Sequence, residues 1–296
     1  MANRAARMLP RASALGLFLL LGCSGGEVSE EPAAEATPDI PGDQQVRTAD
    51  PYARGYTDED FPRVQELAPG VFSYEQLRSA GDERFTTVSL FVVTDEGVVV
   101  ADGQGSVEET QRMVDHIATI TDLPITDVVV CSDHGDHTAG NDAFPEDVTY
   151  HAHPFSLATV NRAAAIQGRD APTWATTAEE VSTEATLSRG GREIQIHFLG
   201  RAHTGGDLVV YMPEEKILFM SEAYLHRIFP AMRTAFPSEW VDMIEAAQAM
   251  DVDVYVPGHG FVDHPSILDD ELELFQGAIR AVIAEARLMH EEGFDL

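Results

Sequence analysis

Four strand-like apolar segments of this 296-residue chain each run directly into a loop that carries histidine, aspartate or glutamate. Functional side chains generally lie on loops that a rigid scaffold holds. If the four segments lie side by side and point the same way, their loops meet at one edge, so the pattern restricts the chain to a sheet-based fold. The four segments with their loops are DVVVC before SDHGDH (127–137), EIQIHFLG before RAHTGGD (193–207), KILFMS before Glu222, and VDVYVP (252–257) with His259 behind it.

The remaining periodicity predicts further strands and helices around these segments. Ser106 begins a predicted helix with apolar residues at helical spacing, and Glu109 completes a capping box with it. The unbroken apolar run at 127–131 is typical of a central strand covered on both faces. Residues 166–180 show little periodicity and are expected to form a loop or lid. The other expected strands are 71–77, 85–94, 97–102, 148–153, 183–187 and 208–212, and the other expected helices are 154–165, 240–250 capped by Ser238, and 267–292.

This order of elements predicts an α/β (α+β) domain. Hairpin-connected strands before and after the helices, rather than a strict alternation, indicate two mixed β-sheets packed together with helices outside. We expect one such domain, at residues 56–296.

The first 55 residues differ in composition from the rest of the chain. Three arginines precede a short apolar stretch that ends before Cys23. This pattern resembles a bacterial lipoprotein signal peptide (1–22) with Cys23 as the lipidated residue, and its apolar run of about ten is too short for the ~20 residues that span a bilayer. Residues 23–55 are rich in Pro, Glu, Ala and Gly and predict a disordered acidic tether. Ser24 after Cys23 indicates, by resemblance to bacterial sorting rules, a lipid-anchored protein of the outer membrane, facing the periplasm or the exterior.

The formal net charge of −31 limits the kinds of partner. So negative a surface repels phosphate backbones and anionic lipid headgroups, which excludes nucleic acid and limits membrane contact to the lipid on Cys23. The expected partner is a small-molecule substrate. Cys131, the other cysteine, ends a strand-like run and is expected to be a buried thiol without a disulfide partner.

The residues on the four loops are of the types that hold divalent metal ions. Imidazole and carboxylate suit zinc and similar ions, and a bound ion lowers the pKa of coordinated water to about 7. A single histidine on a loop is more often solvated or hydrogen-bonded. Two histidines and an aspartate within four positions, at 134–137, are harder to explain in that way. The candidate metal ligands are His134, Asp136, His137, His203, Glu222 and His259.

With these motifs the sequence resembles the metallo-β-lactamase fold superfamily, from about residue 61 to 296. The signature of that superfamily is His-X-His-X-Asp-His, and the runs AHTGGD and VPGHG are also typical of it. The resemblance implies a four-layer αββα sandwich with one or two metals at the sheet edge. It implies that Asp102, in VVVADGQG, supports the metal loop without binding the ion. It assigns His134 and His203 to a first metal, Asp136, His137 and His259 to a second, and Glu222 to the position of a bridging acid.

Two positions depart from the pattern of that superfamily. Ser132 stands in place of the first histidine, and Glu222 stands in place of an aspartate. A hydroxyl is a weak ligand, and a catalytic zinc normally has three protein ligands, so occupancy of the first metal position should fall. The extra methylene of Glu222 either spans a wider site or suits one ion only.

The resemblance implies a metal-dependent hydrolase with one or two Zn²⁺ ions, although other divalent metals would also suit the ligands. A metal-bound hydroxide would attack the carbonyl of an ester, lactone, thioester or amide, β-lactams included. Asp136, which would orient the hydroxide, and His203 are the expected catalytic residues. The alternative is a catalytically degenerate protein of the cell envelope that keeps the fold for binding, and Ser132 is the feature that favours it.

Overall fold

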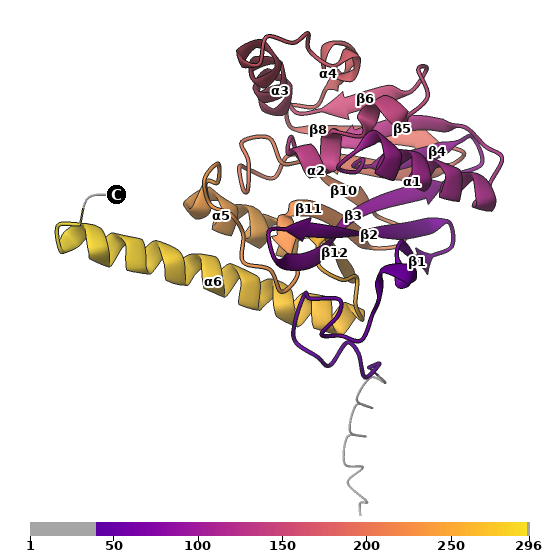
Figure 1. Ribbon diagram of the computed structural model, residues 1–296. Helices are drawn as coiled ribbons and strands as arrows, with labels where there is room; N and C mark the ends of the chain where they lie inside the picture. The colour runs from indigo at the N-terminus through magenta and orange to yellow at the C-terminus, as the bar shows by residue number, and fades with distance from the viewer. Residues whose placement is uncertain (1–39, 295–296) are drawn as a thin grey trace, which may run out of the picture. The chain divides into compact units, whose positions relative to one another are not determined.

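Twelve strands form one continuous sheet in the computed structural model, which describes residues 40–294 (Figure 1). Along the hydrogen-bonded path the order is β7-β6-β5-β4-β3-β12-β11-β10-β9-β8, with β2 also paired to β3 and β1 to β2. The strands are β1 (Arg63–Ala68), β2 (Val71–Ala80), β3 (Glu83–Val93), β4 (Val98–Ala101), β5 (Ile125–Val130), β6 (Thr149–Ala152), β7 (Glu179–Glu180), β8 (Glu184–Arg189), β9 (Arg192–His197), β10 (Val209–Met212), β11 (Ile217–Leu225) and β12 (Val254–His259).

The sheet consists of two halves that meet at a single residue pair. The first half contains β1 to β7 and the second contains β8 to β12, and between them only Thr87 of β3 pairs with His259 of β12 in the ladder. Both halves are mixed, because β4 to β7 are parallel, β11 and β12 are parallel, and the other pairs are antiparallel. The predicted mixed αβ architecture is confirmed, with its two sheets joined into one curled sheet.

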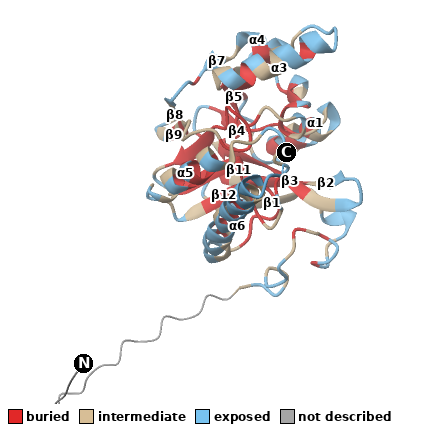
Figure 2. Ribbon diagram, turned by 90° about the vertical axis from the view of Figure 1, so that its left-hand side faces the viewer, coloured by how far each residue is buried: buried red, intermediate tan, exposed pale blue. Residues whose placement is uncertain are grey.

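Helices cover the outer faces of the two halves. An apolar cluster that includes Val128 and Val130 of β5 packs against Met113 of α1, and a second cluster takes Val129 of the same strand and extends to Trp240 of α5. Strand β5 is therefore covered on both faces, as its apolar run predicted. The strands are mostly buried in Figure 2, whereas α6 is mostly exposed. The helices are α1 (Val107–Ile120), α2 (Gly135–Thr138), α3 (Pro154–Ile166), α4 (Thr173–Thr177), α5 (Pro237–Gln248) and α6 (Pro265–Glu291), with short 3₁₀ turns η1 (Asp58–Asp60) and η2 (Asn141–Ala143).

The starts of two helices differ in detail from the prediction. The Ser106 hydroxyl caps α1 by accepting from the backbone N–H of Glu109, but the Glu109 carboxylate accepts from Arg78 at 3.0 Å and so does not complete a capping box. Ser238 was the wrong cap for α5, which begins one residue earlier, at Pro237. Proline suits the first helical position, because the N–H that it lacks would have no partner there.

Residues 166–180, expected to be a loop or lid, contain the short helix α4 and strand β7. Trp174 of α4 is buried and lies 5.9 Å from the ring of Tyr150, while β7 pairs in parallel with β6. The weak periodicity of this segment follows from how short both elements are.

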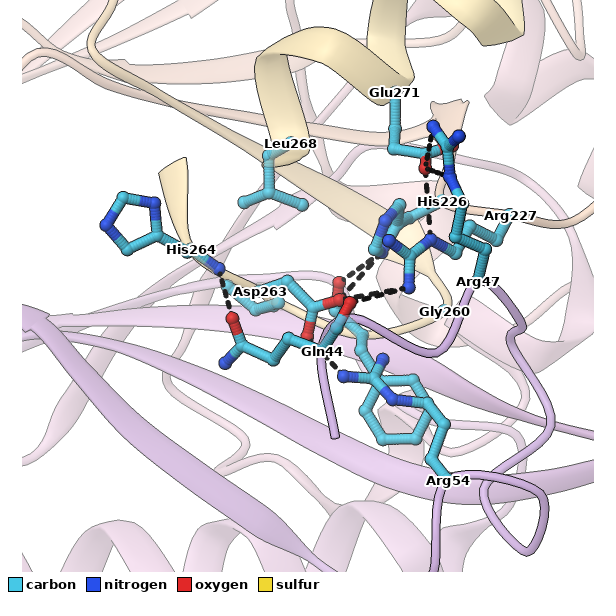
Figure 3. A network of polar contacts seen from close by, with 12 residues as sticks. Gln44, Arg47, Arg54, His226, Arg227, Gly260, Asp263, His264, Leu268 and Glu271 are labelled. Atoms are coloured by element: carbon cyan, nitrogen blue, oxygen red, sulfur yellow. Dashed lines mark hydrogen bonds and ion pairs between the residues drawn. The ribbon is translucent and has the colours of Figure 1, made fainter. Parts of the chain in front are cut away.

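The compact unit begins at Ile40, earlier than the residue 56 that the sequence predicted. The segment 40–60 packs on the loop after β12 and on the start of α6 (Figure 3). The guanidinium of Arg54 is fully buried and pairs with Asp263 at 2.7 Å, and the side chain of Gln44 accepts from the backbone N–H of His264. The polar composition of 40–55 predicted a tether, but its side chains find buried partners on the domain.

The expected signal peptide, Cys23 and the first part of the expected tether lie outside the described residues. Within residues 40–294 no helix has both the length and the apolar composition needed to cross a membrane.

Candidate metal centre

The structure brings together all six residues that the sequence predicted as metal ligands. They form two groups that share Glu222, and within each group one ligand atom per residue lies within 4.8 Å of the others. Asp136, His137, Glu222 and His259 make up the four-residue group, and His134, His203 and Glu222 make up the three-residue group. His134 caps α2, which carries Asp136 and His137, whereas His203 follows β9, Glu222 lies in β11 and His259 ends β12.

The spacing of the four-residue group fits a tetrahedral metal ion. Nε2 of His259 lies 3.3 Å from Nε2 of His137, 3.2 Å from Oδ2 of Asp136 and 3.3 Å from Oε1 of Glu222. Ligands about 2.0–2.1 Å from a tetrahedral ion lie ~3.3 Å from one another. The three distances from His259 therefore suit a single divalent ion, and all four side chains carry suitable donor atoms within 4.8 Å of one another.

The three-residue group is looser but has the same character. Nδ1 of His134 lies 2.8 Å from Oε2 of Glu222, and Nδ1 of His203 lies 3.7 Å from Oε1. Both ring nitrogens of His203 are buried and have no hydrogen-bond partner among residues 40–294. The ring itself is held by stacking on Trp240, at 5.2 Å between centroids. Because buried polar atoms in proteins nearly always have a partner, a metal ion is a fitting one for His203.

Polar contacts behind the ligands, an ion pair at His137 and a hydrogen bond at His259, fix the direction of two imidazoles. Nδ1 of His137 lies 3.0 Å from Oδ2 of Asp102, and Nδ1 of His259 lies 3.0 Å from the carbonyl oxygen of Thr86. Both rings consequently present Nε2 to the four-residue group. Asp102 is itself held, because it accepts from the backbone N–H of Cys131 at 2.7 Å and from the Ser221 hydroxyl at 2.5 Å. Such outer contacts orient metal-binding histidines in many proteins.

The carboxylates of the two groups shift the pKa values of the neighbouring imidazoles. Burial opposes protonation of His134, but the hydrogen bond and charge of Glu222 outweigh it and raise the pKa of His134 to about 9. Burial is likewise outweighed at His259, where Asp136 and Glu222 raise the pKa to about 10. Burial would raise the pKa of Glu222, yet hydrogen bonds to His134 and His259 hold it well below its usual value. A metal ion must therefore displace protons from these rings.

Ser132, which the sequence suggested as a weak ligand at most, has a different partner. Its side chain is fully buried, and its hydroxyl donates to Oε2 of Glu222 at 2.5 Å. The hydroxyl oxygen of Ser132 also accepts from the backbone N–H of His134 at 3.3 Å. The contact between Ser132 and Glu222 spans 90 positions in sequence, so no local pattern could have predicted it.

The two groups are open to solvent on one side. The side chains of His134 and Asp136 are 29% and 23% exposed, whereas those of the other four candidate ligands are 5% exposed or less. Gly135 stands between the two exposed ligands and, with Asp133, lines a cavity of about 400 Å³ that reaches Val160 of α3 and Trp174 of α4. No local pattern predicts this cavity, because its wall is formed by two separate stretches of the chain, 133–142 and 159–174.

Comparisons with known proteins agree with this fold. The sequence model of the Metallo-beta-lactamase superfamily matches residues 82–259, a range that contains all six candidate ligands. A metallo-beta-lactamase type 2 from Bacillus sp. (strain 170) is 23% identical over 218 residues, covering 72% of this chain and 82% of the relative. The alpha subunit of a 2,4-dinitroanisole O-demethylase from Nocardioides sp. (strain JS1661) is 25% identical over 177 residues, covering 58% of this chain and 52% of that protein.

Solved structures show the same architecture. A metallo-beta-lactamase from Pontibacter korlensis superposes with a TM-score of 0.63 at 24% identity, over 72% of this chain and 98% of that chain. Since the family model spans more than half of the sequence, this chain belongs to the metallo-beta-lactamase superfamily.

Proposed function

We propose that this protein is a zinc-dependent hydrolase that cleaves a carbonyl ester, lactone, thioester or amide of a small molecule. The observation that carries the proposal is the pair of ligand groups sharing Glu222, open to solvent beside His134 and Asp136. The set of imidazoles and carboxylates suits zinc, and the 3.2–3.3 Å separations around His259 support one ion in the four-residue group. The three-residue group would hold a second.

The residues of the chain have distinct parts in this proposal. A bound zinc ion supplies Lewis acidity, which polarises a carbonyl oxygen and acidifies water. His137 and His259, each fixed from behind, would hold the ion of the four-residue group. His203, which stacks on Trp240, would hold the ion of the three-residue group. Asp136, the more exposed of the two candidate carboxylate ligands, would also hold the ion of the four-residue group and orient a water molecule on the solvent-exposed side of that group.

The size of the cavity that Gly135 lines, between His134 and Asp136 in the sequence, supports a small-molecule substrate. At about 400 Å³ it lies within the usual range for ligand pockets, ~300–1,000 Å³. The relatives include a β-lactamase and a subunit of an O-demethylase, so the substrate panel must extend beyond β-lactams. The formal charge of −31 supports a substrate other than nucleic acid.

The test combines metal analysis with a panel of chromogenic esters, lactones, thioesters and β-lactams. We expect one to two equivalents of zinc per chain and hydrolysis of at least one class, lost on chelation and restored by zinc. The variant Asp136→Asn should keep the fold and lose most of the hydrolysis. Stoichiometric zinc without turnover of any class would instead support the degenerate binding protein that Ser132 favours. Absence of bound zinc from protein purified in zinc-containing buffer would refute the proposal.

We also propose that the protein is a lipid-anchored component of the bacterial cell envelope, with the domain facing the periplasm or the exterior. The support is the sequence around Cys23, with Ser24 after it. Expression of the full chain should place it in the membrane fraction, and Cys23→Ser should release it from that fraction. An unchanged distribution in the variant would contradict the anchor.

A further inference from the structure

We propose that Ser132 is a positioning residue that fixes the carboxylate of Glu222 between the two ligand groups, and that these two residues act as a matched pair. The inference rests on the proposed metal-binding function. It concerns the two positions at which the sequence departs from the pattern of the superfamily, and it assigns them a single joint role.

The first step is the hydrogen bonding of Ser132. A serine hydroxyl has one proton to donate, and here the acceptor is Oε2 of Glu222 at 2.5 Å. The hydroxyl oxygen is fixed in turn, because it accepts from the backbone N–H of His134. Ser132 is fully buried, so no water competes for its proton. The hydroxyl is therefore a short, rigid link between the loop after β5 and the carboxylate on β11.

The second step is that the two carboxylate oxygens of Glu222 contact different residues. Oε2 receives Ser132 and faces Nδ1 of His134 at 2.8 Å. Oε1 faces the other way and lies 3.3 Å from Nε2 of His259 and 3.7 Å from Nδ1 of His203. A carboxylate can serve both groups only while its plane keeps this orientation. The last side-chain bond of a glutamate rotates easily by itself, so the hydrogen bond from Ser132 acts together with the contacts to His134 and His259 to hold this orientation.

The third step concerns the volume available to the side chains at positions 132 and 222. Glu222 is 3% exposed and Ser132 is fully buried, and their side-chain oxygens are in direct contact. An imidazole at position 132 would have to occupy the volume that the Glu222 carboxylate fills. A shorter carboxylate at position 222 would withdraw from the Ser132 hydroxyl. Close packing in protein interiors makes both changes costly when they are made singly.

The pairing explains why Ser132 need not weaken the site. A small residue at 132 leaves room for the side chain of Glu222, which is one methylene longer than that of an aspartate. The Ser132 hydroxyl restrains the additional rotatable bond of the glutamate side chain. Contacting residues of this kind show non-additive effects, because each substitution removes the condition under which the other residue is useful.

The experiment measures zinc affinity by competition with a chromophoric chelator, and the visible spectrum of the cobalt(II)-substituted protein. The variants are Ser132→Ala, Ser132→His, Glu222→Asp and the double variant Ser132→His/Glu222→Asp. We expect Ser132→Ala to weaken at least one zinc equivalent by about 10- to 100-fold, the usual range for a residue that orients a ligand, and to alter the cobalt spectrum. Each of the other single variants should also weaken binding, whereas the double variant should bind zinc more tightly than either of them.

Ser73→Ala is the matched control, because it removes another fully buried hydroxyl, one without a hydrogen-bond partner in the described part of the chain. It should leave zinc affinity and the cobalt spectrum unchanged. Circular dichroism identifies any variant that fails to fold, and Ser132→Ala, which only removes one oxygen, keeps the test decisive if Ser132→His does not fold.

The outcomes separate this inference from the proposed function. Wild-type zinc affinity and an unchanged cobalt spectrum in Ser132→Ala would overturn the positioning role while leaving the metal site intact. A double variant that loses the sum of both single losses would overturn the matched pair. A wild-type protein that binds no zinc would overturn the proposed function and this inference together.

Discussion

At the scale of single residues, the centre depends on side chains whose second polar atom is already engaged. His137 and His259 each have one ring nitrogen against an oxygen of the protein, and this leaves the other nitrogen directed at the ligand group. Asp102 holds His137 and has an unusual backbone, with φ at +64°, in the left-handed region that non-glycine residues rarely adopt. The three contacts of its carboxylate, with His137, Cys131 and Ser221, account for its persistence there.

We predict that Asp102→Asn lowers zinc affinity by about 10- to 100-fold, the range typical of outer residues that orient a histidine ligand. The amide cannot accept from His137, Cys131 and Ser221 together, so the His137 ring loses its fixed direction. Competition with a chromophoric chelator measures the change. Asp122→Asn, which removes an exposed carboxylate, should have no effect. Equal affinity of Asp102→Asn and wild type would mean that His137 is oriented by packing alone.

At the scale of secondary structure elements, ion pairs join parts of the sheet that the ladder leaves apart. Asp127, near the start of β5, is fully buried and accepts from His151 of β6 at 2.9 Å. It also accepts two hydrogen bonds from Arg189 of β8, at 2.8 and 2.9 Å. Strands β5 and β8 belong to different halves of the sheet. The bidentate ion pair between Asp127 and Arg189 therefore links the two halves of the sheet near the start of β5. The loop that carries the candidate ligands follows the other end of this strand.

We predict that Asp127→Asn destabilises the protein by about 1–3 kcal/mol at pH 7, because charged hydrogen bonds are lost and Arg189 keeps an unpaired charge. Burial would raise the pKa of Asp127, but hydrogen bonds from His151 and Arg189 lower it to about 2. A lowered pKa means that the stabilisation is complete above pH ~4 and disappears as the pH falls towards 2. Thermal melts at pH 7 and pH 2.5 should show the difference from wild type shrinking in acid.

The control for this prediction is Asp251→Asn, which removes the partner of Lys216 in an exposed ion pair. Exposed pairs contribute ~0–1 kcal/mol, so this variant should melt close to wild type at both pH values. A constant difference between Asp127→Asn and wild type across the pH range would show that the charge of Asp127 is not what stabilises the contact.

A second element-scale link is the segment 40–60. The pair between Arg54 and Asp263 is completely buried (Figure 3). The Arg54 guanidinium also lies 3.9 Å from the centre of the Phe261 ring. We predict that Arg54→Met costs about 3 kcal/mol, because the buried Asp263 then loses its 2.7 Å partner and keeps only the more distant Arg227, at 3.7 Å. Thermal or urea unfolding measures the loss. Arg280→Met breaks an exposed pair with Glu245 and should cost ~1 kcal/mol or less, and equal losses in the two variants would contradict the buried role.

How much of this could be predicted from the sequence depended on distance along the chain. Local patterns predicted the ligand-bearing loops, the doubly covered β5 and the Ser106 cap, since neighbouring residues determine them. The partner of Ser132 lies 90 positions away, and the partner of Arg54 lies 209 positions away. The segment 40–55 looked disordered because its composition says nothing about partners elsewhere. Resemblance to the superfamily predicted the grouping of the ligands, but not the contact that joins its two departures.

At the scale of the whole molecule, electrostatics limits what can approach the centre. The formal charge is −31, and the cavity that Gly135 lines is bordered by Asp133, Asp142 and Asp170, with Arg169 as the one cationic side chain of its wall. A field of one sign around a cleft changes the rate at which charged ligands arrive by ~10- to 10³-fold, and salt suppresses the effect. Bound metal would offset only part of this negative charge.

We therefore predict that, among matched aryl esters, those with an ammonium group have a higher kcat/KM than those with a carboxylate, by about tenfold or more at low ionic strength. Because screening acts over ~3 Å near 1 M salt and ~30 Å near 0.01 M, the ratio should fall towards that of uncharged controls as salt is added. Asp170→Asn, remote from the ligands in sequence, should reduce the preference without changing zinc content. If a carboxylate ester is preferred at low salt, the bound ions, rather than the surrounding protein, determine the electrostatic potential at the solvent-exposed side of the ligand groups.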